Sequence, residues 1–159
     1  MKKIIYTDSE SRLWIVGPVI NTHTLVDGKV VQIPEIIAEE QALQRALAKI
    51  PQGAIDIQIV DESVIPTDRT FRNAWKAGNG VVEHDMEKCR ELHRERLRDL
   101  RKPKLDALDV DFMRALESGA PTGAITAKKQ ALRDVTSDSR LDAAQTVEEL
   151  KLVIPSALL

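Results

Sequence analysis

The feature that most constrains this chain is a glycine-free run of helix-forming residues from Asp85 to Ser118. Asp85 can cap the first turn, and Gly119 follows the last. Pro103 interrupts the run and cannot donate to the carbonyl four residues earlier, so we expect a kink near it or the start of a new segment. Apolar residues line one side at helical spacing: Met86, Cys89, Leu92, Leu97 and Leu100, then Leu105, Leu108, Phe112 and Leu116.

The charges of this helix form two rows. The acidic row is Glu87, Glu91, Glu95 and Asp99, and the basic row is Arg90, Arg94, Arg98 and Lys102. Each acid meets a base three residues later, which stabilises a helix by about 0.2–0.5 kcal/mol per pair. A self-paired, solvated helix is therefore the simplest interpretation. Lys88, His93, Arg96, Arg101 and Lys104 remain as a partial basic patch for an acidic partner surface or, less readily, for phosphates.

Two shorter helices are predicted after the long one. The first covers about residues 123–134, behind Pro121, and the second begins at Thr146. Thr146 and Glu149 match the reciprocal capping pattern, in which each side chain satisfies a free backbone amide. The second half is therefore predicted to be mostly helical.

The first half has the pattern of short strands. Residues 2–7 and 12–16 are rich in β-branched and aromatic residues and are separated by a turn, which predicts a hairpin. Asp27-Gly28 marks a turn within residues 21–33, which form a second hairpin or an ordered loop. A helix is predicted over residues 38–50, because its apolar residues recur at helical spacing and Pro51 ends the run.

A strand follows this helix. Ile55, Ile57 and Ile59 alternate with polar residues, which predicts that the isoleucines face the core. Residues 69–77 and 81–83 flank Gly78-Asn79-Gly80 and are predicted to form a further hairpin.

The fold class predicted from these elements is α+β. The predicted organisation is a small α+β domain over residues 1–66, a connecting hairpin over 67–84 and a helical region over 85–159.

Composition narrows the possible functions. The chain has 159 residues, a net charge of −2 and only 3% aromatic residues, so a stacking platform for single-stranded nucleic acid is hard to build. It has a single cysteine and no apolar stretch near the length that spans a bilayer, so we expect a cytosolic protein with no membrane contact.

The sequence contains few residues whose spacing suits metal binding or catalysis. His84, Cys89 and His93 are the only cluster of metal-capable residues, but a closed zinc site needs a fourth ligand, so ordinary helix-face positions are the favoured interpretation. No glycine-rich phosphate loop is present, and Asp109 and Asp111 diverge on a helix. We therefore expect no catalytic residue, no cofactor and no metal, and a protein that is not an enzyme.

A narrow apolar stripe flanked by charges is typical of a helix–helix contact surface. Its target is either the chain's own later helices, or a second copy in a homo-oligomer or another protein. The residues predicted to bind a partner are Trp75, Leu92, Arg96, Leu97, Leu100, Arg101, Lys104, Leu108 and Phe112.

Several sequence segments resemble those of a known protein family. The segment IPTDRTFRNAW at residues 65–75, with the segments at 86–96, 105–117, 129–134 and 146–155, resembles small tail-region proteins of tailed bacteriophages and prophages. The last two segments are distantly similar to tail-fibre assembly proteins, which commonly end in Trp-Pro where this chain has Ile154-Pro155.

The resemblance implies a virion structural or assembly protein associated with the tail or its fibres. Its partners would be other phage structural proteins, and its location the virion and, during assembly, the host cytoplasm. The alternative, on the same phage resemblance, is a small nucleic-acid-binding regulator that uses the basic helix 88–104.

Overall fold

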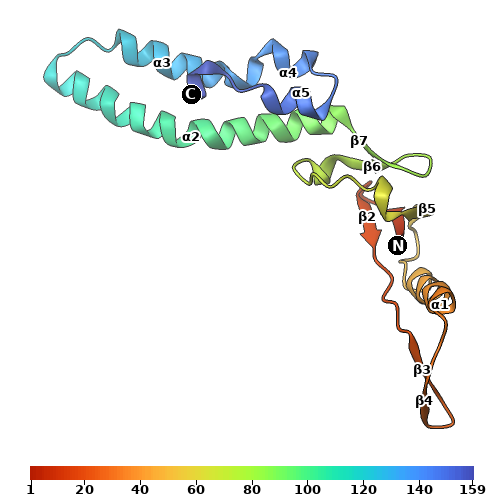
Figure 1. Ribbon diagram of the computed structural model, residues 1–159. Coiled ribbons are helices and arrows are strands. Elements are labelled where there is room, and N and C mark those ends of the chain that lie inside the picture. The colour runs from red at the N-terminus through yellow and green to blue at the C-terminus, as the bar shows by residue number, and fades with distance from the viewer. The chain divides into compact units, whose positions relative to one another are not determined.

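The computed structural model describes residues 1–159 and confirms the α+β class (Figure 1). The chain forms two compact units, Met1–His84 and Asp85–Leu159. Residues 67–84 thus belong to the first unit. The strands all lie in the first unit, and the second is built from helices alone.

A three-stranded antiparallel sheet organises the first unit, in the order β2-β1-β5. Its strands are β1 (Lys2–Thr7), β2 (Leu13–Val16) and β5 (Ile55–Asp61). The predicted hairpin of β1 and β2 is confirmed, with Ile4 opposite Val16. β1 is the central strand, and Ile4 and Ile5 on its two faces are fully buried.

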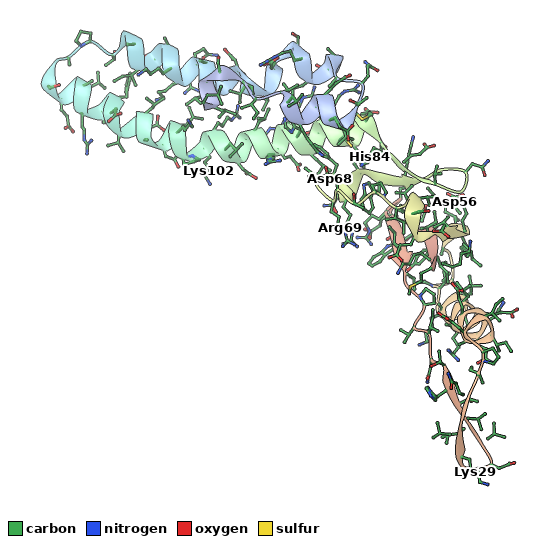
Figure 2. All side chains as sticks on the ribbon, in the orientation of Figure 1. Lys29, Asp56, Asp68, Arg69, His84 and Lys102 are labelled. Carbon is green, nitrogen blue, oxygen red and sulfur yellow. The ribbon has the colours of Figure 1, made fainter.

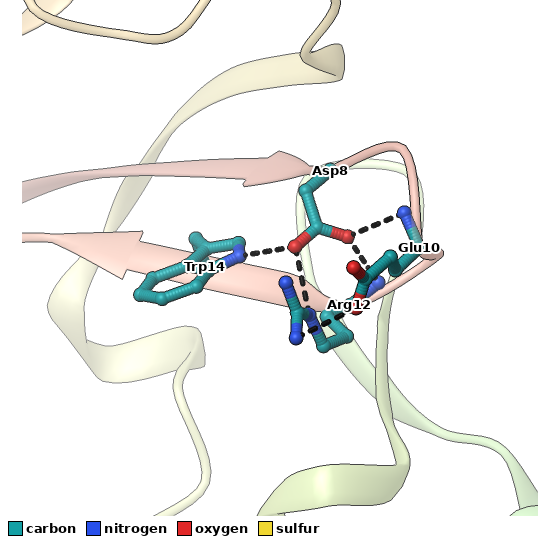
Figure 3. Close-up of polar contacts among 4 residues, drawn as sticks. All are labelled: Asp8, Glu10, Arg12 and Trp14. Carbon is teal, nitrogen blue, oxygen red and sulfur yellow. Dashed lines mark hydrogen bonds and ion pairs between the residues drawn. The ribbon is translucent and has the colours of Figure 1, made fainter.

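The turn between β1 and β2 is built around the Asp8 carboxylate (Figure 3). This carboxylate accepts hydrogen bonds from the Trp14 indole at 2.7 Å, from the Arg12 amide and Nε at 2.9 and 2.8 Å, and from the Glu10 amide at 2.9 Å. These donors, the Trp14 indole first, hold the pKa of Asp8 well below its usual range.

The predicted second hairpin is also confirmed. β3 (His23–Val26) pairs with β4 (Lys29–Gln32) across Asp27 and Gly28, which both have positive φ, as a two-residue hairpin turn requires. The helix that follows, α1 (Glu35–Leu47), begins three residues before the predicted start because the Pro34 carbonyl already accepts from the Ala38 amide. It also ends before residue 50.

The prediction that Ile55, Ile57 and Ile59 face the core is wrong. These side chains are 58%, 47% and 49% exposed, whereas Val60 is only 3% exposed. The register places Gln58 opposite Ile5 and shifts near Asp56, which has a positive φ. The inner face of β5 is therefore the one that carries Gln58 and Val60.

That inner face is covered by the third hairpin, β6 (Trp75–Ala77) and β7 (Val82–His84). Ile5, Val60, Trp75 and Val82 form one buried cluster. The hairpin is shorter than predicted, because residues 69–74 form turns and the 3-10 helix η2 (Arg72–Ala74) instead of a strand. A second short 3-10 helix, η1 (Glu62–Val64), follows β5.

The second unit is organised by α2 (Met86–Ser118), which is 33 residues long. Asp85 caps it as predicted, accepting from the Lys88 amide at 3.1 Å, and Gly119 ends it with φ of 69°. The helix continues through Pro103, which excludes the alternative of a new segment there and agrees with the prediction of one long helix. Packing of the helix against later elements of its unit offsets the backbone hydrogen bond that the proline removes.

The rest of the second unit returns along α2 (Figure 1). Its elements are α3 (Gly123–Arg133), η3 (Asp134–Ser137), α4 (Ser139–Ala143), α5 (Val147–Leu152) and η4 (Ser156–Leu158). Both α3 and α5 contact α2. Leu97, Leu132, Leu141 and Leu150 are among the buried side chains.

The capping prediction at Thr146 is half right. The Thr146 hydroxyl accepts from the Glu149 amide at 3.2 Å, as predicted. The Glu149 carboxylate, however, accepts from the Gln145 amide at 2.7 Å and not from Thr146 itself. The short helix α4 before it was not predicted, since five residues are too few for a periodic signal.

Candidate interaction surfaces

The structure separates the predicted partner-binding residues into three groups. Trp75 and Leu97 are 4% and 1% exposed, so both side chains belong to the packed interior. Leu92, Arg101, Leu108 and Phe112 are half-buried. Only Arg96, Leu100 and Lys104 are exposed, and Leu100 is the one large apolar side chain of the set that is half free.

Much of the apolar stripe of α2 packs within its own unit. Leu108 lines a shallow, mostly apolar hollow of about 420 Å³ together with Ala131 and Leu132 of α3. The Phe112 ring lies under Lys129, whose Nζ is 4.9 Å from the ring centroid and also pairs with Asp109. The interpretation that this stripe packs against the chain's later helices therefore describes this stretch of α2.

Most of the ion pairs predicted between the acidic and basic rows of α2 do not form. Of the four pairs, only Glu91 and Arg94 come within ion-pair distance, at 3.9 Å. Arg90 instead donates to the Ala144 carbonyl, and Arg101 to the Arg133 carbonyl, each at 2.7 Å. Arg94 reaches Asp142 at 2.5 Å. Carbonyls at helix ends lack intrahelical partners, so they compete well for these guanidinium groups.

The three metal-capable residues are used for other purposes. His84 Nε2 accepts from the Trp75 indole at 3.0 Å, and His93 Nε2 lies 3.0 Å from the Val153 carbonyl. Cys89 is fully buried, and this burial, with a smaller effect of Asp85, raises its pKa to about 11. No group of three or more His, Cys, Asp or Glu side chains in residues 1–159 is arranged to hold a metal.

The most exposed apolar surface lies in the first unit, on the hairpin β3–β4. All eight of its strand residues are exposed, and Leu25 and Val30, which pair across the two strands, are 70% and 69% exposed. Figure 2 shows Lys29 at the tip of this hairpin. An isolated two-stranded hairpin is at best marginally stable in water, so this element has the properties of one that a partner covers.

A second apolar surface lies on the sheet. Trp14 is 45% exposed and, with the register pairs Tyr6–Trp14 and Ile4–Ile59, shares one face of the sheet with Ile57 and Ile59. α1 packs against β1 but leaves the outer isoleucines half-exposed. Both β2 and β5 are edge strands of the three-stranded sheet. Sequence reasoning missed the sheet surface because it placed the isoleucines of β5 in the core. The sequence of residues 21–33 carries no local signal that the hairpin joins no larger sheet.

Comparison with known protein families, with curated proteins and with solved structures found no significant match. None of the helices combines the length and the apolar character that crossing a bilayer demands.

Proposed function

We propose that this protein is a virion structural or assembly protein of a tailed bacteriophage, associated with the tail or its fibres, and that it acts by binding other proteins. The observation that supports protein binding most directly is the hairpin β3–β4, whose apolar side chains are exposed on strands without a sheet to join. The phage assignment rests on the resemblance of residues 65–75 and of the later segments.

The hairpin can contribute substantially to an interface. Leu25, Val26, Val30 and Val31 are between 42% and 70% exposed. Leu25 and Val30 share one face of the hairpin, and Val26 and Val31 share the other. Full burial of a leucine or valine side chain is worth about 1.5–3 kcal/mol, so a partner that covers the exposed part of Leu25 and Val30 gains about 2–4 kcal/mol. The partner is a second copy of the chain or another tail protein with an apolar surface.

The contacts made by the basic side chains of α2 favour this proposal over the nucleic-acid-binding alternative. Of the basic patch that the sequence left free, Arg101 donates to the Arg133 carbonyl and His93 is only 3% exposed. Fewer cations of this patch therefore remain for phosphates, and binding to nucleic acid would lose part of its electrostatic driving force.

A deletion experiment tests the proposal. The gene is removed from the phage or prophage that encodes it, and particles are purified, imaged by electron microscopy and analysed by mass spectrometry. We expect particles with missing or defective tails or fibres, and recovery when the wild-type gene is supplied. Detection of the protein in purified wild-type particles identifies a structural component, and its presence only in infected cells identifies an assembly factor.

Variants of the hairpin link the defect to its surface. Leu25→Asp with Val30→Asp is expected to fail in complementation, because it places charges where an apolar partner packs. Lys29→Ser, at the polar tip of the same hairpin, is the matched control and should complement. Normal particles and normal infectivity after deletion would contradict the proposal.

A further inference from the structure

The first unit contains a cationic pocket that the proposed function does not use. It is about 470 Å³ in volume and is lined by the charged residues Lys3, Glu62, Arg69 and Arg72, with Ile65 and Trp75 among its apolar walls. This volume lies within the usual range of ligand pockets, about 300–1,000 Å³. The segment that carries the phage resemblance, residues 65–75, supplies most of the lining.

The loop that forms the pocket is held by its own hydrogen bonds. The Asp68 carboxylate accepts from the Thr70 amide at 2.9 Å and from the Thr70 hydroxyl at 2.6 Å. The Arg72 amide donates to the Arg69 carbonyl at 3.1 Å. Figure 2 shows Asp68 and Arg69 on this loop. These bonds hold the backbone of the loop before a ligand arrives, which lowers the entropic cost of ordering it on binding.

The pocket has an uncompensated positive charge. Lys3 pairs with Glu62, with 3.3 Å between Nζ and Oε1. Gly17 leaves room for this amine, since a β-carbon at that position would lie 3.3 Å from Nζ. Arg69 and Arg72 are exposed, and neither has a carboxylate within 4.0 Å. Three cations and one carboxylate leave a net charge of +2.

We propose that this pocket binds an acidic peptide segment of a partner protein, in which two carboxylates flank an apolar side chain. Arginine presents a planar fork of donors that matches a carboxylate, so Arg69 and Arg72 each take one acidic side chain. The apolar residue between them lies against Ile65 and Trp75. A simple inorganic anion would use the arginines but would leave the apolar walls uncovered.

This inference extends the proposed function by naming the chemistry of one partner segment, but its test does not depend on a phage particle. A failed deletion experiment leaves peptide binding to be measured on the purified protein, and absence of peptide binding leaves the role of the hairpin intact.

The probes are three capped peptides in which two glutamates are separated by one, two or three residues that include a leucine, each with a glutamine-for-glutamate control. Binding to the full chain is followed by NMR through the indole N–H signals of Trp14 and Trp75, which Trp14→Phe assigns. We expect at least one acidic peptide to shift the Trp75 signal and leave that of Trp14 unchanged, and the glutamine controls to bind at least about tenfold more weakly.

Two variants connect binding to the arginines. Arg69→Gln with Arg72→Gln is expected to weaken peptide binding by about tenfold or more. Arg45→Gln with Lys49→Gln, which removes the same two positive charges elsewhere in the first unit, should not. The indole signals of the free variants show whether each is folded.

Three outcomes would overturn the proposal. The first is no shift of the Trp75 signal with any of the peptides at millimolar concentration. The second is equal affinity for inorganic phosphate, which would indicate a small-anion site. The third is tighter binding of a short DNA duplex with the same dependence on Arg69 and Arg72, which would indicate a nucleic-acid contact.

Discussion

The indole N–H of Trp75 donates a hydrogen bond to Nε2 of His84, 3.0 Å away, across the two strands of the hairpin β6–β7. The rings meet edge to face, with their centroids 6.3 Å apart. This geometry requires an unprotonated Nε2, because the nitrogen acts as an acceptor. Trp75 is the largest side chain in the core of the first unit, so its one polar atom is satisfied inside the fold.

His84→Leu is therefore expected to destabilise the first unit. It leaves the buried indole N–H without an acceptor, which costs about 1–3 kcal/mol. His84→Gln supplies a carbonyl acceptor and should recover part of the loss. Urea unfolding followed by tryptophan fluorescence measures this unit alone, since both tryptophans lie within it. Equal stability of the wild type and the leucine variant would contradict the assigned hydrogen bond.

The lowered pKa of Asp8 predicts that the folded protein loses stability in acid. Its pKa is lowered in the folded chain, chiefly by the hydrogen bond from the Trp14 indole. The carboxylate therefore stabilises the folded state above its ordinary pKa of about 3.9, and this contribution is lost as the pH falls through the lowered folded value. Fluorescence-monitored unfolding between neutral and acid pH should show the decline. Asp8→Asn removes the titration and should flatten it, whereas Asp27→Asn, in another turn, should not.

Replacement of Pro103 by alanine is expected to stabilise the second unit. Pro103→Ala restores a backbone hydrogen bond in the middle of a helix that already continues through this position, and should stabilise the second unit by about 1–3 kcal/mol. Thermal unfolding followed by far-ultraviolet circular dichroism should show a higher midpoint. Lys102→Ala, an exposed neighbour, should change the free energy of unfolding by less than about 0.5 kcal/mol. An unchanged midpoint for Pro103→Ala would indicate that packing depends on the geometry imposed by the proline.

The thiol of Cys89 is expected to react slowly in the folded protein. Because its side chain is fully buried and its pKa is raised to about 11, little thiolate exists near neutral pH. A thiol-reactive dye should label the native protein slowly and the urea-unfolded protein quickly, with one label per chain. Rapid labelling of the native protein at neutral pH would show that the helix around Cys89 opens readily.

The sequence predicts elements with strong local signals. The long helix α2 begins at the Asp85 cap and ends at Gly119, and both ends follow from single residues. The effect of Pro103 does not follow in the same way. A proline costs about 3 kcal/mol inside a helix, and whether the helix breaks depends on how much packing lies on each side of it, which is a tertiary property.

Strand β5 shows why periodicity alone is insufficient. The alternation of its residues is visible in the sequence, but the side that faces the core is not. Gln58 turns inward because its side chain donates to the Gly78 carbonyl at 3.0 Å and accepts from the Gly80 amide at 2.8 Å. A polar residue that satisfies a distant turn cannot be distinguished locally from one that faces water.

The candidate sites were less predictable than the fold. The ion-pair rows of α2 were inferred from spacing, but Arg90 and Arg101 bond to carbonyls far along the chain. The cationic pocket joins Lys3 and Glu62 to Arg69 and Arg72, and no local pattern connects these positions. Arg69 and Arg72 are close in the sequence, but three-residue spacing alone does not indicate a pocket.

Because the strand residues of the hairpin β3–β4 are exposed, substitutions there act differently from substitutions in the core. All eight of its strand residues are exposed, and none of them belongs to the buried cluster of Ile5, Val60, Trp75 and Val82. Under the proposed function, substitutions at these eight positions would alter which partner binds while changing the free energy of folding by only about 0.5 kcal/mol each, as is usual for surface residues.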